Sequence, residues 1–162
     1  MHLFDNIKDY QHNLIKHSKL INLNKNLSYW GFVPCNVNHL KHLYTIYENN
    51  MSMIDLGCGI GNVMRFAKNI GYDVIGVEMN KELIKHNPYK VITSNLFNID
   101  LKAIENFDIV FSYKPIKKGF DTFLNEVVNN MKLGSYLVIP EFEFKNEKLK
   151  QIERFYYKKI HS

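Results

Sequence analysis

The stretch IDLGCGIGN, residues 54–62, decides the fold that we predict for this chain. An apolar run ends at Asp55, glycines follow at positions 57, 59 and 61, and an amphipathic segment comes next. Glycines at such a turn let the backbone bend sharply and let a ligand approach the main chain closely. The pattern therefore predicts a strand, a ligand-binding turn and a helix, in that order.

Short apolar runs alternate with amphipathic segments throughout the chain after residue 50. This alternation is typical of an α/β protein, in which helices cover both faces of a mostly parallel sheet. The predicted strands cover residues 51–56, 73–78, 90–93, 107–112, 135–140 and 154–160. The predicted helices lie near residues 62–70, 80–86, 100–105, 120–132 and 145–152.

The first fifty residues follow a different pattern. Residues 1–28 have apolar side chains at close to helical spacing, and residues 29–34 form an aromatic turn before a second helix. We predict that residues 1–50 form a helical lid or substrate region and that residues 51–162 form the cofactor-binding catalytic core. The lysines of the first helix leave a membrane-surface role open, although a helix packed on the domain is the commoner arrangement.

Two residues of the glycine-rich turn indicate which ligand it binds. A dinucleotide site requires a further glycine or alanine at the position of Asn62, where helix and strand pack closely. The Asp55 carboxylate would also repel a pyrophosphate, whereas S-adenosylmethionine brings a sulfonium and an ammonium cation. The turn therefore favours S-adenosylmethionine and makes a dinucleotide-dependent reductase a poor alternative.

The second predicted strand ends in Glu78, seventeen residues beyond Gly61. Parallel strands end at the same edge of a sheet, so this carboxylate lies near the glycine-rich turn. Its oxygens can accept hydrogen bonds from ribose hydroxyl groups. We therefore predict that Glu78 binds the cofactor ribose.

Three segments resemble a known family: DLGCGIGN at residues 55–62, VEMN at 77–80 and MKLGSYLV at 131–138. Together they are similar to the first two motifs and the fifth strand of class I, Rossmann-like S-adenosylmethionine-dependent methyltransferases. The resemblance spans roughly residues 51 to 140. It implies a doubly wound, mostly parallel sheet with helices on both faces. The complete class I sheet has seven strands ending in a hairpin, and we predict about six here, with a trimmed C-terminal edge.

The resemblance also assigns roles at the cofactor site. It implies that Asp55 and the glycines face the methionine part, that Glu78 binds the ribose and that Met79 covers one adenine face. Asn95 stands where the family often has an aspartate that binds the adenine amino group, although a simple turn asparagine is an equal alternative. The predicted cofactor-binding residues are Asp55, Gly57, Cys58, Gly59, Gly61, Asn62, Glu78, Met79, Asn95, Leu96 and Ser112.

The predicted active site follows the fourth strand, at the sequence FSYKPI of residues 111–116. Family members that methylate base amino groups or glutamine amides carry Asn/Asp-Pro-Pro-Tyr/Phe at this place, and this chain does not. Tyr113 and Glu141 are the catalytic candidates, because a phenol can orient a nucleophile and a carboxylate can accept its proton. A packing or surface role is an equal alternative for both. Tyr29, Trp30 and Pro115 are the predicted substrate contacts.

The sequence FVPC at residues 32–35 resembles the Phe-Val-Pro-Thr motif of small lysine methyltransferases, with Cys35 in place of threonine. A lysine acceptor must first lose a proton, and a desolvating aromatic channel built from Tyr29, Trp30 and Tyr113 would lower the pKa of its amine. The same motif can instead be an aromatic anchor that closes over the cofactor. A protein lysine is therefore one candidate acceptor, beside a small molecule or RNA.

Composition limits the other possibilities. The net charge of +5 comes almost entirely from lysine, and arginine, the usual bidentate reader of phosphates and guanine, occurs only twice. Cys35 and Cys58 lie far apart and indicate neither a zinc site nor a disulfide. With no apolar run of membrane-spanning length and no signal peptide, we predict a cytoplasmic protein. A degenerate, non-catalytic S-adenosylmethionine-binding module stays open as the alternative function.

Overall fold

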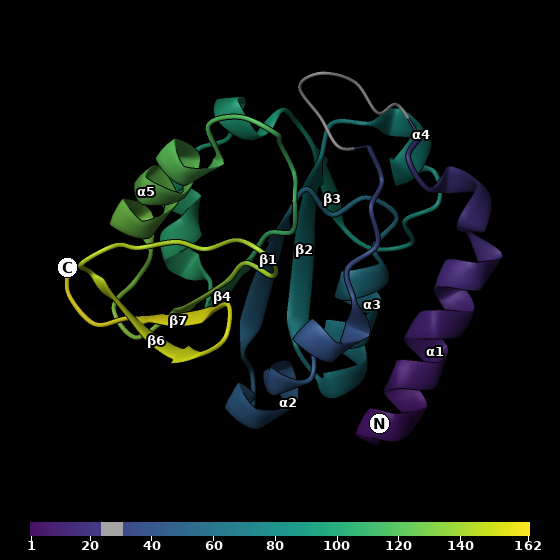
Figure 1. The fold of residues 1–162 in the computed structure, drawn as a ribbon, viewed down its shortest axis with the longest axis horizontal. Helices are drawn as coiled ribbons and strands as arrows, with labels where there is room; N and C mark the ends of the chain where they lie inside the picture. Colours follow the sequence, from purple (N-terminus) through teal and green to yellow (C-terminus); the bar gives the residue numbers. More distant parts are fainter. Residues whose placement is uncertain (24–30) are drawn as a thin grey trace.

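The computed structural model describes residues 1–23 and 31–162, in which seven strands form one mixed sheet (Figure 1). The strands are β1 (Ser52–Leu56), β2 (Asp73–Glu78), β3 (Val91–Thr93), β4 (Ile109–Phe111), β5 (Tyr136–Val138), β6 (Leu149–Glu153) and β7 (Tyr156–Lys159). Their order across the sheet is β3-β2-β1-β4-β5-β7-β6. The first five run parallel, and β7 is antiparallel to both of its neighbours. The predicted α/β class is confirmed.

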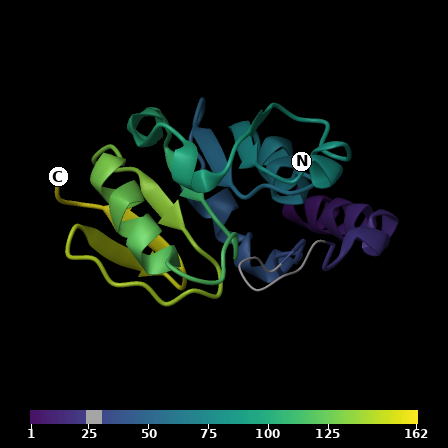
Figure 2. The same cartoon turned by 90° about the horizontal axis from the view of Figure 1, so that it is seen from above.

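Helices cover both faces of this sheet. They are α1 (Leu3–Lys16), η1 (Ser18–Leu20), η2 (Val37–His39), α2 (His42–Ile46), α3 (Asn62–Ile70), α4 (Lys81–Ile84), η3 (Leu96–Asn98), η4 (Leu101–Asn106) and α5 (Phe120–Asn130). In the two ribbon views α1 and α3 lie on one side and α5 lies on the other (Figure 1, Figure 2). The predicted helix near 100–105 is present as the 3-10 helix η4, and Asp100 caps it by accepting a hydrogen bond from the Lys102 amide.

Two hydrophobic clusters lie on the two faces, because successive side chains of a strand point to opposite sides. On β1, Met53 joins the cluster beneath α1 and α3, whereas Ile54 and Leu56 join the cluster beneath α5. The first cluster also contains Tyr10 and Leu43 from the N-terminal region. Residues 1–50 and the sheet therefore share one core.

The C-terminal edge differs from the prediction. The predicted helix at 145–152 is wrong, because residues 149–153 form β6 and pair with β7. The backbone reverses between the two strands at Phe155, whose φ is 67°. The sheet therefore has seven strands and ends in a complete hairpin, instead of about six strands and a trimmed edge. Most of β6 is exposed, so its apolar spacing carries little information and pairing with β7 decides its conformation.

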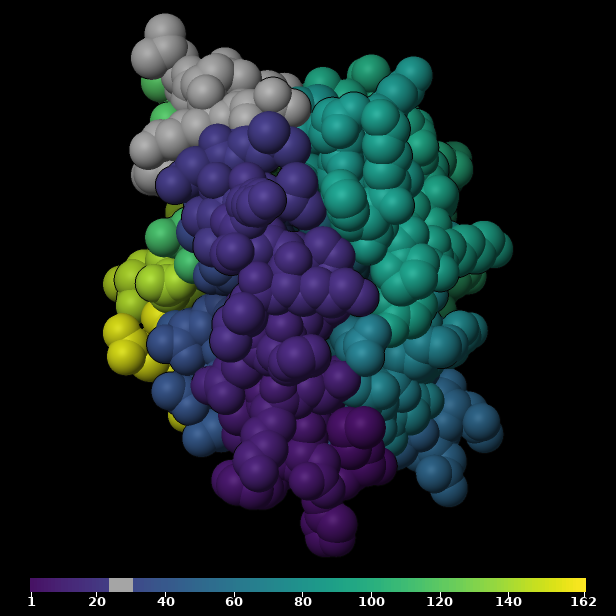
Figure 3. All heavy atoms as spheres, turned by 90° about the vertical axis from the view of Figure 1, so that its right-hand side faces the viewer, coloured from purple at the N-terminus to yellow at the C-terminus, as the bar shows by residue number. Residues whose placement is uncertain are grey.

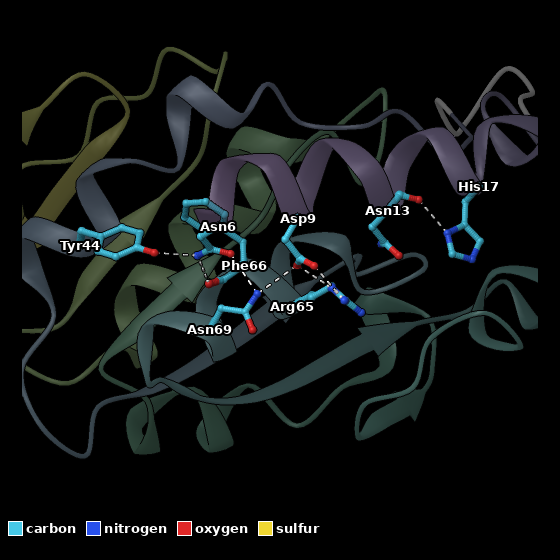
Figure 4. A network of polar contacts seen from close by, with 8 residues as sticks. All are labelled: Asn6, Asp9, Asn13, His17, Tyr44, Arg65, Phe66 and Asn69. Carbon is cyan, nitrogen blue, oxygen red and sulfur yellow. Dashed lines mark hydrogen bonds and ion pairs between the residues drawn. The ribbon is translucent and has the colours of Figure 1, made fainter. Parts of the chain in front are cut away.

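A polar network attaches α1 to α3 (Figure 4). The fully buried Asn6 donates from Nδ2 to the Phe66 carbonyl at 2.9 Å and to the Tyr44 hydroxyl at 2.9 Å. One helical turn later, Asp9 pairs with Arg65 at 2.7 Å. The space-filling view shows α1 lying lengthwise against the domain (Figure 3).

No helix in the described part of the chain has the length and apolar character needed to cross a bilayer.

We expect the Asn6→Ala substitution to lower the free energy of unfolding by about 2 kcal/mol, because it removes a buried group with partners on two other elements. Urea denaturation would measure the change. The exposed neighbour Gln11 on the same helix provides the control, and Gln11→Ala should stay within about 0.5 kcal/mol of the wild type. Equal effects of the two substitutions would contradict the docking role of Asn6.

Candidate functional site

A cavity of about 440 Å³ lies at the carboxyl ends of the parallel strands. The loops that follow β1, β2, β3 and β4 form its walls, together with part of the segment that precedes η2. Its lining residues are Leu23, Gly31, Phe32, Val33, Cys35, Asp55, Gly57, Cys58, Gly59, Asn62, Val63, Val77, Glu78, Met79, Asn80, Lys81, Leu83, Ser94, Asn95, Leu96, Phe111, Tyr113, Lys114, Pro115 and Ile116. This edge is where ligands bind in open α/β sheets.

The turn after β1 is held by hydrogen bonds to β2. The amides of Gly57 and Cys58 both donate to the Val77 carbonyl, at 2.8 and 3.0 Å. The Gly59 amide donates to Glu78 Oε1 at 2.8 Å, and Asn87 Nδ2 donates to the Gly59 carbonyl at 3.2 Å. The loop is therefore fixed before any ligand binds.

Gly57 needs its missing side chain for two reasons. Its φ is 90°, in the region that L-residues rarely adopt, and a Cβ atom there would lie 2.9 Å from Pro115 Cβ. Pro115 belongs to the loop after β4, so the absence of a side chain lets the two loops meet. Both residues line the cavity.

The Asp55 carboxyl group forms the buried floor of the cavity and is 2% exposed. Within residues 1–23 and 31–162, no hydrogen-bond donor or cation is found on it. Burial, and then the neighbouring Glu78 carboxylate, raises the pKa of Asp55 well above its usual range. A buried carboxylate without a partner is costly, so this position favours a cationic ligand.

Glu78 lies at the end of β2, and backbone amides occupy most of the hydrogen-bond acceptor positions of its carboxylate. Oε1 accepts from Gly59, and Oε2 accepts from the amides of Met79 and Asn80, both at 3.0 Å. A carboxylate offers about four acceptor positions, so about one stays available for a ligand hydroxyl. The side chain thus braces the loop as well as lining the cavity.

The far wall carries apolar and amide groups. Met79, Asn95 and Leu96 line it, and Asn95 Oδ1 caps η3 by accepting from the Phe97 amide at 2.9 Å. This bond is the turn role that the sequence left open for Asn95. Its Nδ2 group has no hydrogen-bond partner among the described residues. Met79 is 39% exposed, so its thioether is accessible to a flat ligand.

Tyr113 and Glu141 meet at the ends of β4 and β5, where the Tyr113 hydroxyl donates to Glu141 Oε2. Burial raises the pKa of Tyr113, and Glu141 raises it further, so the phenol stays protonated. Glu141 has a φ of 61° and is exposed, and Lys114 has a φ of 44°. Tyr113 lines the cavity and links Glu141 to it.

The structure brings together most of the residues that the sequence predicted. Three lie apart from the cavity lining: Gly61, the N-cap of α3, Ser112, whose hydroxyl donates to the Leu56 carbonyl at 2.8 Å, and Glu141, which reaches the site through Tyr113. Tyr29 and Trp30 lie outside the described residues. Those predicted residues that do line the cavity are Asp55, Gly57, Cys58, Gly59, Asn62, Glu78, Met79, Asn95, Leu96, Tyr113 and Pro115.

Sequence reasoning missed two residues that shape the site. Asn87 holds the glycine loop from the end of α4, and its only sequence signal is the Asn-Pro turn that it begins. Tyr10 is one of the apolar side chains that recur at close to helical spacing in residues 1–28. Its hydroxyl in fact donates to the Cys35 carbonyl at 2.6 Å and accepts from Asn62 Nδ2 at 2.8 Å.

Comparison with known proteins places this chain in a family. A family model described as a methyltransferase domain matches residues 54–139, which is more than half of the chain. This match confirms the resemblance to class I methyltransferases inferred from the motifs. None of the curated proteins compared with the chain matches it.

Solved structures share the fold at low sequence identity. An S-adenosylmethionine-dependent methyltransferase from Mesorhizobium loti has a TM-score of 0.51 and 18% identity, covering 61% of this chain and 50% of its own. Phosphoethanolamine N-methyltransferase 2 from Haemonchus contortus, in complex with phosphomonomethylethanolamine and S-adenosylhomocysteine, has a TM-score of 0.55 and 19% identity, covering 82% and 32%. An Archaeoglobus fulgidus methyltransferase has a TM-score of 0.50 and 24% identity, covering 76% and 61%. The chain thus spans about half the length of the first of these.

We expect Gly57→Ala to destabilise the protein more than Gly134→Ala, a matched control. Gly134 has a φ of 85° and open space around its Cβ position, so alanine there costs only the backbone strain of about 1–2 kcal/mol. At Gly57 the overlap with Pro115 adds about 1–3 kcal/mol. Urea unfolding of both variants would measure the difference, and equal losses would show that the two loops do not meet.

We expect Asp55→Asn to stabilise the ligand-free protein at neutral pH. Because the folded pKa of Asp55 is raised, its stabilising contribution is complete below the unfolded pKa of about 3.9 and is lost as the pH rises through the folded pKa. The gain from asparagine should therefore be smallest below about pH 4 and increase as the pH rises.

Urea denaturation at a series of pH values would measure this change in the free energy of unfolding. Asp108→Asn is the control, because its pH dependence should have the opposite sign. Burial raises the pKa of Asp108, but Lys132 and Ser52 outweigh it and leave the pKa lowered. Asp108 therefore stabilises the fold above the unfolded pKa of about 3.9, and this contribution disappears as the pH falls through the lowered value. A loss of stability in Asp55→Asn at neutral pH would contradict the expectation that the buried Asp55 carboxylate destabilises the ligand-free protein.

Proposed function

This chain belongs to the methyltransferase domain family, and from that premise we propose that it binds S-adenosylmethionine in the cavity and transfers its methyl group to a nucleophilic nitrogen or oxygen. The observation that carries the proposal is the buried Asp55 carboxyl group, which lies beside a preformed glycine loop without a partner among the described residues. A cationic cofactor supplies the missing charge.

The cavity residues fit the parts of this cofactor. Asp55 and Asn62 offer acceptor oxygens for the methionine ammonium group, and Glu78 retains acceptor capacity for a ribose hydroxyl. Met79, Leu96 and the Asn95 amide line the wall where the adenine ring would lie. A dinucleotide would instead bring its pyrophosphate towards Asp55, which is unfavourable.

When bound, the cofactor supplies an electrophilic methyl group on a sulfonium, and the protein has to orient the nucleophile and accept a proton. Tyr113 donates its only hydroxyl proton to Glu141, so its oxygen can only accept a further hydrogen bond. An N–H or O–H of the acceptor can therefore donate to Tyr113. The proton that the nucleophile loses would pass to the Tyr113 oxygen as the Tyr113 hydroxyl proton moves to Glu141, which is exposed to solvent. The electron pair of the broken carbon–sulfur bond would stay on the sulfur.

An amine is the acceptor that this arrangement favours, and we propose a protein lysine as the first candidate. The exposed Glu141 carboxylate attracts a cationic chain, and the FVPC segment contributes Phe32, Val33 and Cys35 to the cavity wall. Phe32 packs on Gly59, where a Cβ atom would lie 3.3 Å from its ring, so it also serves as an anchor over the loop. Residues 1–50 thus supply one wall of the site, while residues 51–162 supply the rest.

Two features favoured the non-catalytic alternative: the trimmed sheet edge expected from the sequence, and the missing family acceptor motif. The first no longer supports it, because the sheet has its C-terminal hairpin. The departure at residues 113–116 persists, so turnover decides between the two functions.

We expect titration calorimetry to detect S-adenosylmethionine and S-adenosylhomocysteine binding, weakened by about 1–3 kcal/mol in Asp55→Ala. Radiolabelled S-adenosylmethionine, incubated with protein, RNA and small-molecule fractions of cells, should label the protein fraction.

Tyr113→Phe should lower the turnover number about 100-fold because it breaks the proton path, with cofactor affinity unchanged.

Tyr136→Phe, which removes a hydroxyl from β5 away from the cavity lining, is the control for the loss of a phenol. Label in the RNA or small-molecule fraction would replace lysine as the acceptor. Cofactor binding without any labelled fraction would favour the non-catalytic module. A folded wild-type protein that binds neither cofactor would overturn the proposed function itself.

A further inference from the structure

Tyr10 of α1 lies behind the cavity lining and contacts Asn62, which does line the cavity, and we propose that it sets the chemical polarity of the cavity. By fixing the Asn62 side chain with its amide nitrogen turned away, Tyr10 leaves the Asn62 oxygen as the group available to the methionine ammonium of the cofactor. Tyr10 is thus a positioning residue for ligand selectivity. This inference rests on the proposed function and adds a residue that lies outside residues 54–139, which the family model matches.

The position of Tyr10 is firmly determined. It is 2% exposed, and its ring packs edge-on against Phe66 of α3 with centroids 6.0 Å apart. Asn6 and Asp9, which lie about one helical turn apart, attach α1 to α3 (Figure 4). Tyr10 lies four positions after Asn6, on the same face of the helix. The polar network therefore holds the phenol where it is.

The hydrogen bonds of Tyr10 decide the orientation of Asn62. A backbone carbonyl can only accept, so the single hydroxyl proton of Tyr10 must go to the Cys35 carbonyl, 2.6 Å away. The phenol oxygen then has only acceptor capacity for Asn62, whose amide lies 2.8 Å away. The group facing Tyr10 must therefore be the Asn62 nitrogen.

With its nitrogen facing Tyr10, the Asn62 side chain turns its oxygen towards the cavity. Asn62 lines the cavity, and within the described residues no donor to Oδ1 is found. Every fully enclosed side-chain oxygen in that part of the chain has a partner, so Oδ1 is not fully enclosed. Oδ1 is therefore accessible to a ligand. A reversed amide would place two acceptor oxygens 2.8 Å apart at Tyr10 and present an N–H group to the ligand beside Asp55.

The resulting wall contains acceptors of one kind. Asp55 contributes a carboxylate and Asn62 contributes a carbonyl oxygen, and an ammonium group with its three donors can satisfy both. A ligand without the ammonium group would leave them both unpaired. The chain thus selects for the amino group of the cofactor through a helix that need not touch the cofactor.

The test compares two ligands that differ only at this group: S-adenosylhomocysteine and its analogue in which hydrogen replaces the α-amino group. Titration calorimetry should show that Tyr10→Phe weakens S-adenosylhomocysteine about tenfold, because the Asn62 amide is free to reverse, while the analogue changes less than about twofold. Tyr44→Phe, which removes another hydroxyl from the α1 network, should change neither affinity.

A double substitution tests whether the effect passes through Asn62. In an Asn62→Ala background, Tyr10→Phe should cause no further loss of S-adenosylhomocysteine affinity. Equal weakening of both ligands by Tyr10→Phe, or no weakening of either, would overturn the positioning role while leaving the proposed function intact. Failure of the wild type to bind S-adenosylhomocysteine would overturn the proposed function, and this inference with it.

A measurement on the unaltered protein covers the case in which Tyr10→Phe fails to fold. In the ligand-free wild type, one side-chain amide proton of Asn62 should exchange slowly with solvent in nuclear magnetic resonance spectra, because it is donated to the buried phenol. Fast exchange of both protons would show that the amide faces the other way.

Discussion

The buried carboxyl group of Asp55 is the constraint on which the rest of the structure depends. It lies at the penultimate residue of β1, an inner strand of the sheet, where burial disfavours the charged form and the Glu78 carboxylate adds a like charge. Such a group is unfavourable in the free protein and becomes favourable only when a cation joins it. The glycine loop, the Glu78 carboxylate and the acceptor oxygen of Asn62 all leave Asp55 without a positively charged partner in the free protein.

The central part of the fold could be predicted because local and global signals agree there. The sequence IDLGCGIGN encodes strand, turn and helix, and β2 ends in Glu78 at the expected spacing. The C-terminal hairpin could not be predicted in the same way. Residues 149–153 form an exposed strand with mixed apolar spacing, so only pairing with β7, a long-range interaction, reveals its conformation.

The cofactor side of the candidate site could also be predicted, because its residues are close to one another in two motifs. The contributions of Tyr10 and Asn87 could not. Tyr10 lies 52 residues before Asn62 and resembles any apolar helix position, and Asn87 resembles any turn asparagine. Their roles arise from hydrogen-bond partners that only tertiary packing brings together.

The order of the strands has a consequence for the nascent chain. The strand β7, although later in the sequence than β6, inserts between β6 and β5. During synthesis the edge of β5 therefore stays open until residues 156–159 leave the ribosome, and β6 has no place on the sheet before then. An open strand edge can pair with other chains, so translation leaves a brief window of aggregation risk that closes only when the last strand arrives.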